Sequence, residues 1–214
     1  MKLSKGMKKL TLGGQSQLLD QVRAKVNPLP EWTVAHNDPE AAVLIPLTDS
    51  LEPELVLTRR ASHMNSHAGE VAFPGGKKDW DDRDLIATAL RESHEEIGLP
   101  PSAVDVLGAL DPARSKFGLM VTPIVGVIPK EQQFTPNEQE LDHIFSVPLQ
   151  YFLDTLPNDV YEANYDGERF NAPCYNYEGN IIWGLTAYFI AEFMNQIFDT
   201  DIQIQLRSYQ KNKP

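Results

Sequence analysis

Three glutamates are clustered in the segment LRESHEEIGL, residues 90–99. Glu92, Glu95 and Glu96 are spaced i, i+3 and i+4, so on a helix their side chains share one side and repel each other. Arg91 adjoins them and can hold a carboxylate by a bidentate hydrogen bond. A solvated acidic helix face is one interpretation. A bound divalent cation is the other, because Mg²⁺ prefers oxygen ligands and is typically shared between carboxylates and substrate phosphates.

The segment that carries the glutamates has the periodicity of an amphipathic helix. At about 100° per residue, its buried face is predicted to consist of Ile86, Ala89, Leu90, Ser93 and Ile97. The glutamates lie roughly opposite that face. Aspartates at helix caps and in the first turn are favoured, and four precede this helix: Asp79, Asp81, Asp82 and Asp84. Gly98 is the predicted stop.

The elements around this helix predict a mixed sheet flanked by helices. Strand-like runs occupy residues 41–47, 54–60, 104–110 and 120–128, and residues 136–149 begin as a loop and end as a short strand. Helical spacing marks residues 15–26 and 181–198. The Pro-Gly-Gly sequence at residues 74–76 is a loop signal, and the Tyr- and Asn-rich stretch before residue 181 is predicted to be irregular. Because strands and helices interleave without strict βαβ order, we expect an α/β (α+β) domain.

Composition and charge restrict the class of protein. The chain has 214 residues, 42% of them hydrophobic and 23% charged, as in ordinary globular domains. The net charge of −11 disfavours nucleic acid as a partner. No apolar run approaches the roughly 20 residues that cross a bilayer, and the basic start lacks the apolar core of a signal peptide. With Cys174 as the single cysteine, we expect a cytoplasmic location.

The sequence GGKKDWDDRDLIATALRESHEEIGL, residues 75–99, resembles the Nudix box. The matching positions are Gly76, Arg91, Glu92, Glu95, Glu96, Gly98 and Leu99. The chain departs from the pattern in three ways. The gap from Gly76 to Arg91 is one residue longer than usual, Asp82 or a neighbour replaces the distant glutamate, and Ser93 stands at a hydrophobic position.

Membership of the Nudix superfamily implies an α/β/α sandwich with a mixed sheet and hydrolysis of a nucleoside diphosphate linked to another moiety. The resemblance implies that Mg²⁺ or Mn²⁺ is held by Glu92, Glu95 and Glu96. Arg91 would orient these glutamates. The general base is left open among Glu95, Glu138 and Glu140.

The upstream segment LVLTRRASHMNSHAGEVAFPGG, residues 55–76, resembles the signature of the coenzyme A pyrophosphatase branch. The matching positions are Leu57, Thr58, Arg60, Ala61, Gly69, Phe73, Pro74, Gly75 and Gly76. Asn65 stands where the signature has Arg, and Asn cannot carry that charge. The substrate-binding residues that this resemblance implies are Arg60, His67, Phe73, Gly75 and Gly76.

The expected function is therefore metal-dependent hydrolysis of coenzyme A or its thioesters to 3′,5′-ADP and phosphopantetheine or acyl-phosphopantetheine. The alternatives are a Nudix hydrolase of ADP-ribose or NADH and a non-catalytic Nudix-fold nucleotide sensor. The expected partner is a small nucleotide substrate, without nucleic acid or membrane, and a homodimer is left open. We expect an N-terminal helical arm at residues 1–39 and the Nudix domain at residues 40–214.

Overall fold

The protein is represented by a computed structural model that describes residues 16–29, 40–64, 68–115, 118–157, 159–165 and 168–203. Its helices are α1 (Gln17–Lys25), α2 (Leu85–Ile97), α3 (Leu149–Asp154) and α4 (Gly184–Phe198), with a 3₁₀ turn η1 (Pro101–Ala103). The strands of the main sheet are β1 (Glu40–Asp49), β2 (Glu54–Arg60), β3 (Val71–Ala72), β4 (Gly75–Lys77), β5 (Asp105–Ala109), β6 (Ala113–Arg114), β7 (Met120–Pro129) and β8 (Leu141–Pro148). A smaller sheet contains β9 (Asp159–Tyr165), β10 (Glu168–Tyr177) and β11 (Asn180–Ile182).

Strand β1 organises the main sheet. Within the described ranges this sheet has eight strands, with the order β3-β2-β1-β7-β5, and β4, β6 and β8 pair with β1, β7 and β2. The β1–β7 pair is parallel over the whole length of both strands, and the other pairs are antiparallel. The first residues of β1, Ala41–Val43, pair with β4, whereas Leu47 near its other end pairs with β2. The short β4 is thereby docked beside the start of β1.

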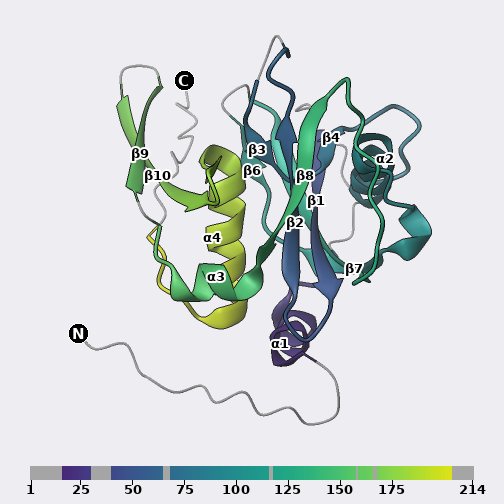
Figure 1. Cartoon of the computed structure of the whole chain (residues 1–214), viewed down its shortest axis with the longest axis horizontal. Coiled ribbons are helices and arrows are strands. Elements are labelled where there is room, and N and C mark those ends of the chain that lie inside the picture. The colour runs from purple at the N-terminus through teal and green to yellow at the C-terminus, as the bar shows by residue number, and fades with distance from the viewer. Residues whose placement is uncertain are drawn as a thin grey trace, which may run out of the picture.

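Both faces of the sheet are covered, as Figure 1 shows, with α2 on one face and α4 on the other. Successive side chains of a strand point to opposite faces. Ala42 and Leu44 of β1 accordingly belong to the core cluster that includes α2 residues, while Ile45 and Leu47 belong to the cluster that includes α4 residues. The predicted α/β/α sandwich with a mixed sheet is confirmed.

The helical part of the N-terminal arm packs against the rest of the chain. Its buried residues Leu19 and Val22 join the core cluster that contains α4. Arg23 forms an ion pair of 2.7 Å with Asp105, the first residue of β5. Ala109, the last residue of β5, makes a β-bridge to Asn27. The helix lies where its spacing predicted it. The division of the chain at residue 40 stays a prediction.

Two local predictions are wrong. The Tyr- and Asn-rich stretch forms the antiparallel β9–β10 hairpin and then β11, not irregular chain. The Pro-Gly-Gly segment is not only a loop, because residues 75–77 pair with β1 as β4. In both places the hydrogen-bonding partner is a strand that the local turn signals do not reveal. No helix in the described part of the chain combines the length and apolar character needed to span a bilayer.

Candidate active site

Helix α2 presents the glutamates next to β4, and its two ends are defined by caps. The Asp84 side chain accepts a hydrogen bond of 2.8 Å from the Ala87 backbone N–H. Gly98 ends the helix in the left-handed conformation, with φ 67°. Leu85, Ala89 and Ile97 are buried against the sheet. These contacts fix the rotation of the helix and therefore the direction of its acidic side.

Arg91 is the centre of a hydrogen-bond network among the acidic groups. Its Nη1 donates to Glu92 Oε1 at 3.0 Å and to Glu95 Oε2 at 3.2 Å. Its Nε and Nη2 donate to the two carboxylate oxygens of Asp82 at 3.1 and 2.9 Å, and Nη2 also donates to the Lys77 carbonyl at 3.1 Å. A guanidinium has five N–H donors, and these five contacts engage all of its nitrogens. Such an arginine orients carboxylates and is not available to bind substrate.

Asp82 is the acidic residue that stands opposite Arg91. Its side chain is 6% exposed and also accepts hydrogen bonds from the Thr88 hydroxyl and the Asp79 backbone N–H. The hydrogen bond from Arg91, helped by these two, holds the pKa of Asp82 at about 2. The sequence predicted Asp82 or a neighbour as the replacement for the distant glutamate. Asp84 serves as the helix cap, and Asp82 is the residue in the ion pair.

The two glycines of β4 allow the strand to approach the glutamates. The Gly75 N–H donates to Glu96 Oε2 at 3.1 Å. A Cβ at Gly76 would coincide with the carboxylate of Glu92. Gly75 has φ 154°, and a Cβ there would meet the backbone of β1 at Ala42. The glycine pair is thus required by close packing on both sides of β4.

Glu96 is the most buried of the three glutamates, with a relative exposure of 5%. This corrects the prediction that all three lie opposite the buried face. Burial, with the nearby charges of Glu140 and Glu92, raises the pKa of Glu96 to about 7, although the Gly75 N–H and Arg60 act in the opposite direction. Burial likewise raises the pKa of Glu92. The acidic side chains at the site nevertheless outnumber the two arginines, Arg60 and Arg91, that contact them.

Carboxylates that the arginines do not neutralise are candidate ligands for a divalent metal. In the described ranges no three His, Cys, Asp or Glu side chains converge as a preformed metal cage. Arg91 holds Glu92 and Glu95, while Glu96 contacts Gly75. The donor set itself, three carboxylates on one helix beside the glycines of β4, is the hard-oxygen set that Mg²⁺ or Mn²⁺ takes. The residues fit the ion in their chemistry, and binding by all three would need their side chains to reorient.

Arg60 lies at the end of β2 and reaches the same cluster. Its Nη1 is 3.7 Å from Glu96 Oε1, and its Nη2 is 4.0 Å from Glu140 Oε2. The buried Nε of Arg60 finds no hydrogen-bond acceptor in the described part of the chain. Arg60 is thus a cation at the site, and its Nε has no acceptor among the described residues.

The loop before β8 brings one of the two candidate loop carboxylates to the site. The Asn137 N–H donates to the Glu96 carbonyl at 2.8 Å, and the Ala61 N–H donates to the Glu140 carbonyl at 2.7 Å. Glu140 is thereby held beside Arg60. Glu138 is exposed in the same loop and, among the described residues, makes no hydrogen bond or ion pair with the glutamates of α2. His67 and Asn65 lie outside the described residues.

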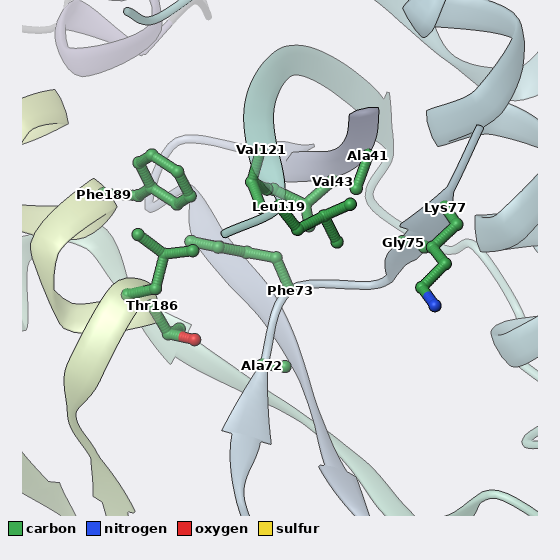
Figure 2. A pocket seen from close by; sticks show the side chains of 12 residues that line it. Ala41, Val43, Ala72, Phe73, Gly75, Lys77, Leu119, Val121, Thr186 and Phe189 are labelled. Atoms are coloured by element: carbon green, nitrogen blue, oxygen red, sulfur yellow. The ribbon is translucent and has the colours of Figure 1, made fainter. Parts of the chain in front are cut away.

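An apolar cavity of ≈ 240 Å³ adjoins the glycine strand on its α4 side. Figure 2 shows Phe73 between Thr186 and Phe189 of α4 on one side and Gly75 and Lys77 of β4 on the other. Phe73 is buried and forms part of the cavity wall. This position explains its match to the upstream signature. The sequence signal for the cavity was the Phe-Pro-Gly-Gly segment. The contribution of α4, more than 100 residues later, was not predicted.

Comparison with known proteins agrees with this fold and box. The NUDIX domain family matches residues 38–165. A protein of Yersinia pestis (strain Pestoides F) named uncharacterized Nudix hydrolase NudL is 43% identical over 176 residues, which are 79% of this chain and 88% of that protein. A protein with the same name from Yersinia pseudotuberculosis serotype O:1b (strain IP 31758) matches with the same identity and coverage. The chain belongs to the Nudix family and is a Nudix hydrolase, a family whose members generally use divalent metal ions such as Mg²⁺ or Mn²⁺.

Solved structures give more distant likenesses. A MutT/nudix family protein from Enterococcus faecalis has a TM-score of 0.49 at 15% identity, covering 79% of this chain and 66% of that one. The Nudix hydrolase RenU from M. smegmatis has a TM-score of 0.45 at 21% identity, covering 54% and 73%. The NUDIX domain of Shewanella oneidensis NrtR, solved with ADP ribose, has a TM-score of 0.43 at 18% identity, covering 59% and 82%.

Proposed function

We propose that this Nudix hydrolase cleaves the pyrophosphate bond of coenzyme A or its thioesters, releasing 3′,5′-ADP and phosphopantetheine or acyl-phosphopantetheine. One observation carries the choice of substrate. Two matching positions of the segment that resembles the coenzyme A pyrophosphatase signature contact the glutamates: Arg60 lies beside Glu96 and Glu140, and Gly75 donates to Glu96. These contacts support a role for the segment in binding substrate at the glutamates.

Charge explains why the site needs a cation. A pyrophosphate is anionic, and it would be repelled by the carboxylates of α2 unless a metal stood between them. Glu92, Glu95 and Glu96 would hold Mg²⁺ or Mn²⁺. The bound ion would supply neutralisation of the charge on the phosphoryl oxygens and a lowered pKa of a bound water.

The protein's own groups have separate tasks in this scheme. Arg91 keeps Glu92 and Glu95 oriented, as its hydrogen bonds to both carboxylates support. Arg60, whose guanidinium lies beside Glu96 and Glu140, offers its charge to a phosphate oxygen of the substrate. The attacking water gives its proton to a carboxylate as its oxygen bonds to phosphorus, and the bridging P–O bond breaks.

The candidates for that general base are Glu95, which is exposed, and Glu140, which is held beside Arg60. Glu138 remains a candidate only if its loop moves toward the glutamates. A base must come within about 2.6–3.2 Å of the water, directly or through one more water. Kinetic comparison of three variants distinguishes the candidates: Glu95→Gln, Glu138→Gln and Glu140→Gln. The variant that lacks the general base should have a lower kcat over the whole pH range in which the other two variants retain their kcat.

A panel of substrates tests the proposal. Purified full-length protein is incubated with Mg²⁺ or Mn²⁺ and coenzyme A, an acyl-coenzyme A, ADP-ribose, NADH or a diadenosine polyphosphate, and products are identified by mass. We expect 3′,5′-ADP and the matching phosphopantetheine as the major products. Brisk turnover of ADP-ribose or NADH without turnover of any coenzyme A species would contradict the proposal. Tight nucleotide binding without hydrolysis of any of them would indicate a sensor.

A further inference from the structure

The apolar cavity next to β4 lies one strand away from the proposed metal ligands. Gly75 lines the cavity and also donates its N–H to Glu96, and Gly76 lines it and packs on Glu92. Only the backbone of two glycines separates the cavity from the acidic cluster. A substrate that lies across these two glycines would have its pyrophosphate at the glutamates and its adjoining chemical group in the cavity.

The size of the cavity restricts what can occupy it. Complete small-molecule sites generally have volumes of roughly 300–1,000 Å³, and this one has ≈ 240 Å³. It can hold one part of a nucleotide derivative and not the whole molecule. Lys77 lies at the side of the cavity next to the glycines, so the end nearest the glutamates is the charged end.

The lining determines the chemistry of that part. Among the described residues that line the cavity, only Lys77 and Thr186 have polar side chains, and the Thr186 hydroxyl donates to the Val71 carbonyl at 3.0 Å. Phe73, Leu119 and Phe189 contribute apolar surface. Away from Lys77, the described side chains therefore leave no free hydrogen-bond donor for an acceptor on the ligand. A group with several hydroxyls would lose water there without replacing its hydrogen bonds.

We propose that the cavity receives the branched, doubly methylated carbon of the pantoyl group, next to the phosphate ester of a coenzyme A-type substrate. This inference rests on the proposed function and names how the site distinguishes its substrate. ADP-ribose and NADH carry a ribose at the same position. Each ribose hydroxyl left unpaired would lower binding by roughly tenfold, whereas burial of the two methyl groups raises it by roughly 10–50-fold.

A matched substrate pair isolates this contact. Dephospho-coenzyme A and ADP-ribose share the whole adenosine diphosphate half and differ in the group on the second phosphate. Ala72 is half-buried in the cavity wall, so Ala72→Leu fills the space, and Ala24→Leu on the exposed side of α1 is the control. Leu119→Asn introduces a hydrogen-bonding group into the cavity and serves if Ala72→Leu does not fold.

Turnover and product binding are measured on the same full-length proteins with Mg²⁺. We expect Ala72→Leu to lower kcat/KM for dephospho-coenzyme A by roughly 10–50-fold, mainly through KM, and to change kcat/KM for ADP-ribose less than threefold. Leu119→Asn should narrow the preference between the two. By calorimetry, the wild type and Ala24→Leu should bind 4′-phosphopantetheine more tightly than ribose 5-phosphate, and Ala72→Leu should lose that preference.

The two readouts keep this inference distinct from the proposed function. If the protein hydrolyses coenzyme A but Ala72→Leu changes kcat/KM equally for both substrates, or not at all, the cavity assignment is overturned. The proposed function is then left intact. Preferential, Ala72-dependent binding of 4′-phosphopantetheine without turnover of coenzyme A overturns the proposed function and supports the cavity assignment. Absence of both overturns both.

Discussion

Replacement of the buried Glu96 by Gln distinguishes the effect of its charge on folding stability from its role in catalysis. The pKa of Glu96 is raised from 4.5 to about 7, first by burial and then by the charges of Glu140 and Glu92. At about 1.4 kcal/mol per pKa unit, ionised Glu96 destabilises the metal-free folded state by about 3 kcal/mol at pH 8. The pKa of about 7 already includes the attraction to Arg60. Gln keeps an acceptor for the Gly75 N–H but buries an amide NH₂ group, so we expect a net gain of about 2 kcal/mol.

The sign of this effect depends on pH. A carboxyl with a raised folded-state pKa stabilises the folded protein below its unfolded pKa of 4.5, and that stability is lost as pH rises through about 7. Glu96→Gln should therefore be more stable than the wild type at pH 8 and nearly equal to it at pH 4.5. For a chain of this size, 2 kcal/mol corresponds to about 4–8 °C in Tm.

The assay is thermal unfolding in EDTA at pH 4.5, 6 and 8, with Glu95→Gln as control. Glu95 has a side-chain exposure of 56%, so its replacement should change Tm little at any pH. With Mg²⁺ added, the wild type should gain stability and hydrolyse substrate, while Glu96→Gln should gain less and lose activity by orders of magnitude. A Tm difference that does not vary with pH would refute the electrostatic reasoning. Full activity of Glu96→Gln at saturating Mg²⁺ would refute its assignment as a metal ligand.

Three further outcomes are expected. Asp82→Asn should lower the free energy of unfolding by about 1–3 kcal/mol, because it weakens a buried hydrogen-bonded partner of Arg91, and should lower kcat/KM at least tenfold. Asp81→Asn, at an exposed position, is the control. Equal effects of the two changes would exclude the pairing of Asp82 with Arg91. Gly76→Ala should displace the Glu92 carboxylate and raise the Mg²⁺ concentration needed for half-maximal activity, measured by metal titration; an unchanged titration curve would contradict this. Chelation of divalent ions should abolish hydrolysis and Mg²⁺ or Mn²⁺ should restore it, and activity in excess EDTA would exclude a metal mechanism.

Most of the local architecture was predictable from the sequence because it depends on neighbouring residues. The helix that carries Arg91 has a cap at Asp84 and a stop at Gly98, and both are used as expected. The predicted strands at residues 41–47 and 54–60 lie within β1 and β2, since continuous apolar runs predict buried strands. The acidic cluster could be recognised in the sequence because glutamates at i, i+3 and i+4 of a helix repel each other.

The burial of Glu96 was not predictable from helix periodicity. Periodicity compares residues on one helix, but the groups that cover Glu96 come from other elements: Gly75 from β4, Arg60 from β2 and Asn137 from the loop before β8. For the same reason, the sequence predicted only Asp82 or a neighbour in place of the distant glutamate. Only the turn that leads into α2 determines that Asp82 faces the guanidinium.

The sequence by itself determined the family chemistry: three glutamates and an arginine on one helix, preceded by two glycines, with the spacing of a Nudix box. Those features are local, and a contiguous segment contains all of them. The tertiary structure alone decided which carboxylate is buried and has a raised pKa, which arginine lies beside it, and where an apolar cavity adjoins the glycines that contact the acidic cluster. These properties arise from contacts between β1, β4, β7, α2 and α4, because desolvation and packing depend on what surrounds a side chain and not on what precedes it in the chain.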